Sequence, residues 1–435
     1  MSIKIVNVFL NHYGQKINVG RLAYRDKIIY FEYSKEFLSL GIELSPYKLP
    51  LKSGVHICED NLFEGLFGVF NDSLPDGWGR LLLDRYFLRK GINYRDITPL
   101  DRLSYVGSYG IGALTYEPYV DNEKSNNVEI DLDILAISSS EILQGNSEKM
   151  LDVLLNIGAS SSGARPKAII QLSDDKKTII HGAMALKDGF SHYLVKFASA
   201  YDSNDIGSIE YIYSLMAKEA KIEMSDTVLL KGQKNSYFSI KRFDRHEDEK
   251  VHIHSVAGLT HSDFRFPTLD YDDLLSLTLH LTKDVDEQLK MFRLACFNLF
   301  AHNRDDHAKN FSFLLDRNGR WKLSPAYDLT FSYGPGGEHS TTYMGEGKNP
   351  TMQHLLDLAK KHNLKSAQKI ITEVKTAVSN FQNYTKQIKI TRESNRLILG
   401  WIENIMKLIN KQADVTINSI NEKKVLIILQ RGVIS

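Results

Sequence analysis

Alternating apolar and polar positions divide the chain into a strand-rich beginning and a mostly helical end. Residues 3–9, 16–24 and 27–33 alternate with a period of two, which predicts half-buried strands joined by short turns. Apolar positions then recur at helical spacing, most regularly from Tyr271 onward. Further strands are predicted at 168–172, 191–197, 228–230, 237–240 and 311–315, and helices at 78–89, 101–105, 130–145, 147–157, 208–220, 272–281, 285–299, 352–361, 365–381 and 391–408. The order indicates an α+β protein.

A polar stretch between an apolar helix and an apolar strand is the first candidate site. Residues 302–310 read HNRDDHAKN. Asp305 and Asn310 are separated by four residues, as in the catalytic loop of protein kinases, where the Asp orients the substrate hydroxyl and the Asn binds magnesium. Asp328 follows at short range and could be the second metal-binding residue. The spacing leaves open whether Asp305 or Asp306 is the base, and the place of His307 favours a site role over a packed histidine.

A serine- and glycine-rich stretch is a candidate phosphate loop. Residues 158–167 read GASSSGARPK, and small residues there let backbone N–H groups approach an anion. The Gly-Lys-Ser/Thr of a Walker A motif is missing, and composition alone would suit a flexible linker. Its place ahead of strands and of the polar stretch favours the phosphate loop.

Lys196 stands out in an apolar strand. Burying an unpaired ammonium is expensive, so Lys196 needs an anion, either nucleotide phosphates or a carboxylate such as Glu210 of the next helix. An exposed lysine on an edge strand is the alternative. Phe243, in KRFDR, falls where the linker between the lobes of a kinase passes the adenine.

Composition adds outer bounds. The 435 residues are 43% hydrophobic and 25% charged, as in a globular protein of several domains, and the net charge of +1 predicts no general attraction to nucleic acid or membrane. Neither a signal peptide nor a membrane span is predicted, and with Cys58 and Cys296 as buried free thiols the expected location is cytoplasmic. Among the charges after residue 245, His246, His252 and His254 are predicted to lie in a solvated loop rather than a metal site.

Taken together, the loop, strand lysine, helix glutamate, linker, Asp-x4-Asn and following Asp have the order of a protein kinase. The segments HNRDDHAKNFSFLL and WKLSPAYDLTF resemble the C-terminal signature of the HipA family of serine/threonine kinase toxins. SSSGARPKA, LVKFA and KRFDR resemble its nucleotide loop, strand lysine and linker, and FNDSLPDGWGR and VGSYGIGAL its accessory region. The resemblance implies a two-lobed, protein-kinase-like α+β fold. Its expected parts are a β-rich N-terminal accessory subdomain (1–115), an N-lobe-like part with the nucleotide loop (116–245) and an all-helical C-terminal domain (246–435).

The same resemblance implies roles for individual residues. It favours Asp305 over Asp306 as the catalytic residue, together with His307, and places Asn310 and Asp328 on Mg²⁺. The implied ATP-binding residues are Ser162, Gly163, Ala164, Lys167, Lys196, Phe243, Asn310 and Asp328. Autophosphorylation of a loop serine is implied at Ser160, with Ser161 and Ser162 as alternatives.

Partners also follow from the resemblance. It implies a HipB-like helix-turn-helix antitoxin, contact with operator DNA only through the antitoxin complex, and a translation protein such as an aminoacyl-tRNA synthetase as substrate. Two other readings stay open. A small-molecule kinase on the same fold would turn over ATP with a metabolite and would not phosphorylate itself. A non-catalytic antitoxin- and DNA-binding corepressor would fail to bind Mg-ATP.

Overall fold

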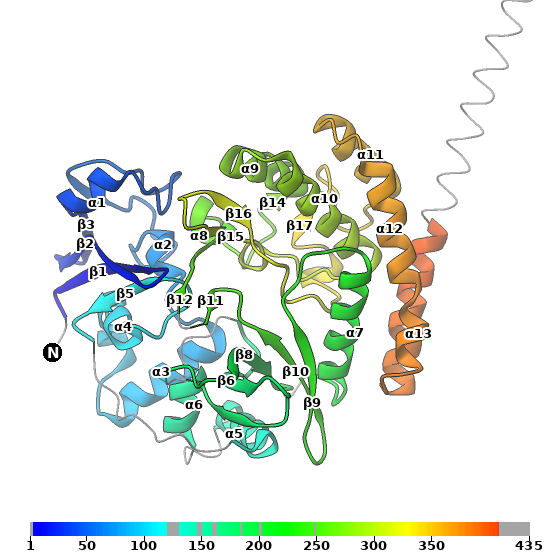
Figure 1. Ribbon diagram of the computed structural model, residues 1–435, viewed down its shortest axis with the longest axis horizontal. Helices are drawn as coiled ribbons and strands as arrows, with labels where there is room; N and C mark the ends of the chain where they lie inside the picture. Colours follow the sequence, from blue (N-terminus) through cyan, green and yellow to red (C-terminus); the bar gives the residue numbers. More distant parts are fainter. Residues whose placement is uncertain are drawn as a thin grey trace, which may run out of the picture. The chain divides into compact units, whose positions relative to one another are not determined.

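The computed structural model describes residues 3–119, 130–145, 150–158, 163–182, 185–199, 202–247 and 249–408 (Figure 1). The chain forms two compact units. The first consists of residues 1–211, 224–265 and 308–328, and the second of residues 212–223, 266–307 and 329–435. The three sequence-based parts with boundaries after residues 115 and 245 stay a prediction.

The first unit opens with an antiparallel sheet in the order β4-β3-β2-β1-β5. Its strands are β1 (Ile5–His12), β2 (Gln15–Arg25), β3 (Ile28–Tyr33), β4 (Val55–Ile57) and β5 (Leu114–Glu117), accompanied by α1 (Lys35–Leu40), α2 (Gly68–Asn71), α3 (Gly77–Arg89), η1 (Tyr94–Asp96) and α4 (Pro99–Val106). Along β1, Val6, Val8 and Leu10 are buried while Ile5 and Asn7 are exposed. The period of two in the sequence therefore corresponds to one buried face.

A second sheet in the first unit has the order β7-β6-β8-β10-β9. Its strands are β6 (Lys167–Ser173), β7 (Ile179–His181), β8 (Phe190–Lys196), β9 (Thr227–Lys231) and β10 (Ser236–Lys241), with helices α5 (Leu132–Gln144) and α6 (Leu151–Gly158). Helix α7 (Ile206–Glu219) begins in this unit, and its residues from Ile212 onward belong to the second. Trp78 of α3, Leu135 of α5, Leu154 of α6 and Tyr193 of β8 belong to one buried cluster. Helix α3 thus shares a core with the sheet that carries the candidate phosphate-binding lysines (Figure 1).

The first unit is completed by a small sheet in the order β13-β15-β16 and by the pair β11-β12. These elements are β11 (Arg245–His246), β12 (Glu249–Lys250), β13 (His252–Ser255), α8 (Val256–Thr260), η2 (Ala308–Asn310), β15 (Ser312–Leu315) and β16 (Trp321–Leu323). The prediction of a solvated histidine loop is wrong for His252 and His254, which are buried on β13. Tertiary acceptors explain their burial: His252 Nε2 lies 3.2 Å from the Leu44 carbonyl oxygen, and His254 Nδ1 lies 2.6 Å from an Asp72 oxygen.

The second unit is mostly helical. It contains β14 (Leu269–Asp270), α9 (Tyr271–Thr282), α10 (Val285–Phe300), η3 (Pro335–Gly337), β17 (Thr341–Thr342), α11 (Met352–Lys361), α12 (Ala367–Ser379) and α13 (Phe381–Thr385), and residues 392–408 are also helical. Helix α9 begins with a capping box: the Asp270 side chain accepts from the backbone N–H of Asp273, and the Asp273 side chain accepts from the backbone N–H of Asp270.

The predicted α+β class is confirmed, and most predicted elements lie within a few residues of the observed ones. One detail differs: the part after residue 246, expected to be all helical, also contains β12 to β17. Of these, β15 corresponds to the strand predicted at 311–315, whereas the others contain two to four residues, too few for a periodicity to be recognised.

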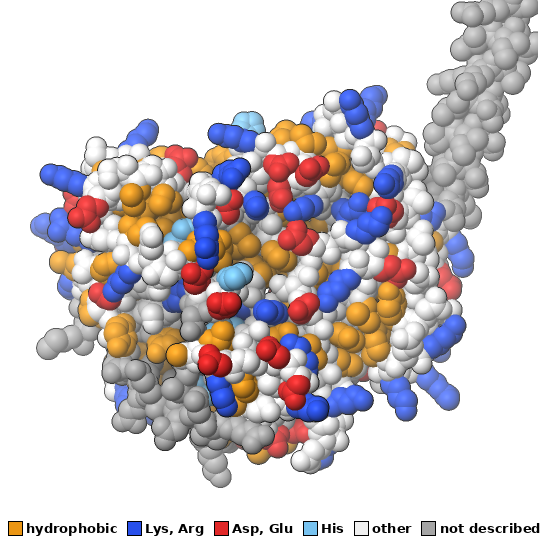
Figure 2. Space-filling view, in the orientation of Figure 1, with side chains coloured by type: hydrophobic (Ala, Val, Ile, Leu, Met, Phe, Trp, Pro, Cys, Tyr) orange, Lys and Arg blue, Asp and Glu red, His pale blue; other side chains and the backbone are white. Residues whose placement is uncertain are grey.

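Surface charge follows the composition. On the face drawn in Figure 2, acidic and basic side chains are interspersed. Within the described ranges, no helix combines the length and the apolar character that crossing a bilayer requires.

Candidate active site

Two buried lysines face each other at the end of two neighbouring strands. Lys167 begins β6 and Lys196 ends β8, and the antiparallel register makes them direct partners. Their residues are only 4% and 9% exposed. Like charges opposite each other on a sheet repel, and burial makes this worse. The pair therefore requires negative charge nearby.

Two carboxylates supply that charge within the first unit. The Lys196 ammonium contacts the Glu210 carboxylate of α7 and lies 2.5 Å from Asp328 Oδ1. Burial lowers the pKa of Lys196, but Asp328 and Glu210 outweigh it and hold that pKa above the ordinary value. Burial also lowers the pKa of Lys167; the Asp328 carboxylate offsets part of this, and the Lys196 ammonium lowers the pKa further. The two lysines and the two carboxylates therefore balance in charge, and an anion could bind the lysines where it replaces one of the carboxylates.

Gly163 fits closely against this site. Its φ of +99° lies in the region that favours glycine, and a Cβ placed there would lie 2.5 Å from Lys167 Nζ. The lysine head group therefore occupies the space of a side chain at position 163. Ala164 is part of the same described segment, whereas Ser160, Ser161 and Ser162 lie outside the described residues.

Asn310 and Asp328 are positioned by one tyrosine between them. The Tyr327 hydroxyl donates to the Lys309 carbonyl at 2.6 Å and lies 2.6 Å from Ser312 Oγ, so it contacts the residue before Asn310 through its backbone and a residue after it through its side chain. Asp328, next to Tyr327, has a φ of +54°, which turns the chain sharply after this contact. A carboxylate and an amide oxygen are ligands that suit Mg²⁺, so the chemistry of these two residues fits the ion expected from the sequence.

Phe243 lies just after β10, and its ring centroid is 5.6 Å from that of Tyr327. The next residue, Asp244, is buried between Arg242 and Arg245. Burial favours the neutral acid, but the two guanidinium groups and the Gly112 N–H outweigh this and hold the pKa of Asp244 well below its usual range. The linker is thus fixed by an ionic network that spacing in the sequence did not reveal.

The neighbouring carboxylates Asp305 and Asp306, both in the second unit, have different environments. Asp306 is buried, and its oxygens accept hydrogen bonds from the Tyr271 hydroxyl, the His339 ring and the backbone N–H groups of Ser340 and Thr341. The Asp305 side chain is 53% exposed, with His307 Nε2 3.8 Å from its Oδ1. Asp306 therefore anchors the loop, whereas Asp305 is open to solvent.

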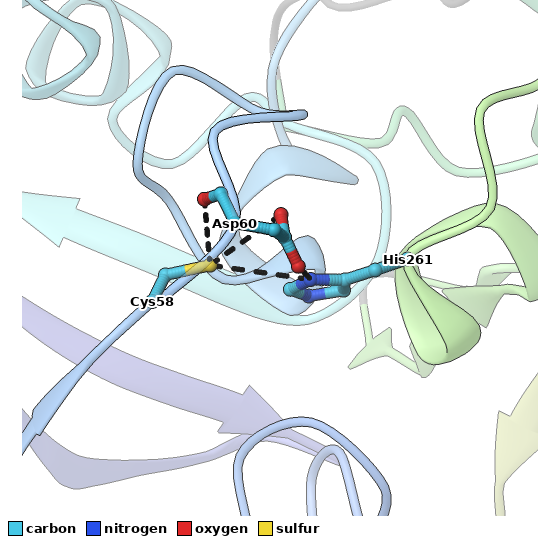
Figure 3. Close-up of side chains that lie close together, drawn as sticks. All are labelled: Cys58, Asp60 and His261. Carbon is cyan, nitrogen blue, oxygen red and sulfur yellow. Dashed lines mark hydrogen bonds and ion pairs between the residues drawn. The ribbon is translucent and has the colours of Figure 1, made fainter.

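A third cluster, Cys58, Asp60 and His261, contains residue types that can bind metal (Figure 3). Asp60 Oδ2 lies 2.5 Å from His261 Nδ1, whereas two atoms bound tetrahedrally to one zinc ion at about 2.1 Å would be roughly 3.4 Å apart. The Gly68 N–H donates to His261 Nε2, so the neutral ring carries its proton on Nδ1, the atom that faces Asp60 and Cys58. Burial raises the pKa of the Cys58 thiol to about 11. The cluster is hydrogen-bonded in a way that opposes metal binding.

The geometry also contains residues that the sequence pattern did not single out. Asp76 contacts both the N–H of Gly163 and the ammonium of Lys309, and Trp78 hydrogen-bonds to the same segment. FNDSLPDGWGR was noted only for its resemblance to an accessory region, because nothing local connects it with a loop nearly ninety residues later.

Comparisons with known proteins show what the chain is similar to. A curated relative from Haemophilus influenzae, described as a putative kinase, is 24% identical over 187 residues, which cover 40% of this chain and 52% of the relative. The chain thus spans about half the length of the curated relative that it matches. HipA of Shewanella oneidensis MR-1, solved with HipB and its operator DNA, shares the fold with a TM-score of 0.68 and 15% identity, over 94% of this chain and 99% of that one.

Family models match both parts of the chain. Residues 7–117 match the HipA N-terminal domain, and residues 159–381 match the HipA-like C-terminal domain. The second match alone covers about half of the 435 residues and includes the lysine pair and the polar stretch. The chain therefore belongs to the HipA family.

Proposed function

We propose that the protein is an ATP-dependent serine/threonine protein kinase of the HipA type. The observation that carries the proposal is the buried pair Lys167 and Lys196, opposite each other with Glu210 and Asp328 as counter-charges. If Asp328 holds Mg²⁺, the two ammonium groups keep only the Glu210 carboxylate as counter-charge, an arrangement suited to a polyphosphate.

On the nucleotide side, Lys196 and Lys167 hold phosphate oxygens, and the backbone of Ser162, Gly163 and Ala164 covers them. Phe243 supports the adenine, and Asn310 and Asp328 would hold Mg²⁺, which when bound would offset the charge on the phosphates. The close contact of Gly163 with Lys167 supports this assignment, because a side chain at position 163 would displace the ammonium.

On the acceptor side, Asp305 orients the hydroxyl of the substrate and accepts its proton. His307 lies near enough to Asp305 to influence its orientation. The exposure of Asp305 and the burial of Asp306 support this choice of base.

We propose the biological role of the HipA family for this protein as well. The protein acts as the toxin of a type II toxin–antitoxin pair, phosphorylates a serine of a translation protein of the aminoacyl-tRNA synthetase class, and modifies its own loop at Ser160, Ser161 or Ser162. The match to both HipA domains, and to a HipA solved with HipB and operator DNA, supports a helix-turn-helix antitoxin as partner and contact with DNA through that complex.

The test is peptide mass spectrometry before and after incubation with Mg-ATP. A phosphate gained on the peptide containing residues 160–162, and absent in Asp305→Asn, is the expected result. ATP turnover with metabolites but without self-phosphorylation would favour a small-molecule kinase. Failure to bind Mg-ATP would favour a non-catalytic corepressor.

A further inference from the structure

Asp76 stands at the N-cap of α3, yet it does not cap its own helix. An Asp at this position usually accepts from a backbone N–H in the first turn. Here the side chain makes no such bond. One oxygen accepts from the N–H of Gly163, and the other binds the ammonium of Lys309 in the polar stretch.

The backbone of Gly163 takes the place of the missing cap at the start of α3. Its carbonyl oxygen accepts from the backbone N–H of Trp78 at 3.0 Å, while its N–H donates to Asp76. The buried Trp78 indole N–H donates to the Lys167 carbonyl at 3.1 Å. Helix α3 and the segment from Gly163 to Lys167 therefore complete each other's hydrogen bonds.

The backbone of Gly77 lies so close to the backbone of Gly163 and Ala164 that no side chain fits between them. A Cβ at Gly77, which has a φ of +45°, would lie 2.6 Å from the Gly163 carbonyl oxygen and 2.8 Å from Ala164 Cα. The contact is thus direct, backbone against backbone. Lys309 is held from a second side, because its Nζ lies 4.3 Å from the centroid of the Phe264 ring.

We propose that Asp76, Gly77 and Trp78 form a latch that holds the segment Gly163–Lys167 against the rest of the first unit. By this latch, residues matched to the HipA N-terminal domain keep Lys167 in place and tie the end of the nucleotide loop to Lys309. Asp76 is a positioning residue for the site, and this consequence for nucleotide affinity rests on the proposed kinase function. The N-terminal part thereby contributes directly to the site.

The experiment compares Asp76→Ala, Asp76→Asn and a control with the full-length protein. Hydrogen exchange of the amides from Gly163 to Lys167 should become about 10- to 100-fold faster in Asp76→Ala, because a charged contact and a hydrogen bond are lost. The Kd for Mg-ATP should rise by a similar factor, with a smaller change in kcat at saturating ATP. Asp76→Asn keeps an acceptor for Gly163 but loses the charge that binds Lys309, so its effect should be intermediate.

The matched control is Asp131→Ala. Asp131 is the N-cap of α5 and accepts from the N–H groups of Asp133 and Ile134, as an ordinary cap does. It should leave exchange in the 163–167 segment and the Kd unchanged. Unchanged exchange in both Asp76 variants would overturn the latch. If the wild type bound no Mg-ATP, the kinase proposal would fail, and faster exchange in Asp76→Ala would still support the latch.

Discussion

Replacing Lys196 by Met tests the physical basis of the site without any assay of activity. The variant leaves Glu210, which is 2% exposed, without its nearest cation. Breaking a buried ion pair by removing one partner costs about 3–5 kcal/mol in the free energy of unfolding, since the remaining charge is uncompensated. Asp328 adds little to this cost, because its side chain is 34% exposed and can be solvated.

The lower end of that range, about 3 kcal/mol, is expected at neutral pH. Lys167 stays in place directly opposite position 196, and its charge interacts favourably with Glu210 and Asp328. Burial already raises the pKa of Glu210, and loss of Lys196 removes the attraction that lowers it. In the variant, folded Glu210 therefore binds its proton more strongly than the unfolded chain does.

This shift gives the deficit a definite pH dependence. Between the ordinary pKa of a glutamate and the raised pKa of folded Glu210, the folded state holds more protons, so stability falls as pH rises. The slope approaches about 1.4 kcal/mol per pH unit. The difference between wild type and Lys196→Met should be larger at pH 8 than at pH 5.5.

The assay is urea unfolding followed by circular dichroism at both pH values. A second variant, Lys196→Met with Glu210→Leu, replaces the pair by apolar side chains and should recover most of the loss. A deficit below about 1 kcal/mol in the single variant would refute the reasoning, since it would mean that the pair is effectively solvated. So would a double variant no more stable than the single one.

Three further predictions concern other groups. Asp305→Asn should fold normally and lower phosphoryl transfer by roughly 10²–10⁴-fold, as an activity assay can measure. Asp306→Asn should instead lower the melting temperature, as a thermal melt can measure, because four donors converge on that carboxylate. Burial, with Arg245 and Arg242 nearby, lowers the pKa of Lys250 to about 7. Between about pH 7 and pH 10 the unfolded chain therefore binds more protons at Lys250 than the folded protein does, so the free energy of unfolding rises with pH. Lys250→Met should lose this rise, which unfolding titrations at several pH values can measure. Cys58 should resist alkylation in the native protein at pH 8, and rapid labelling would contradict its raised pKa.

Much of the local structure could be predicted because it depends on neighbours in sequence. Alternation along the first strands and helical spacing in the second unit each reflect one buried face. Lys196 was recognisable because a lysine in an apolar strand conflicts with its surroundings, and the conflict is resolved by Glu210, 14 residues away, and Asp328, 132 residues away. The prediction failed for His252 and His254, whose charged neighbours in sequence say nothing of the acceptors that bury them.

By itself, then, the sequence determined the α+β class, the order of the candidate parts and the residue types available for phosphoryl transfer. Tertiary structure decided how those residues are paired. It set Lys167 opposite Lys196 by strand register, buried Asp306 while exposing Asp305, and turned Asp76 from its own helix toward Gly163. The physical reason is that the energy of a charge depends on its burial and its partners, and both are fixed by contacts between residues distant in the chain.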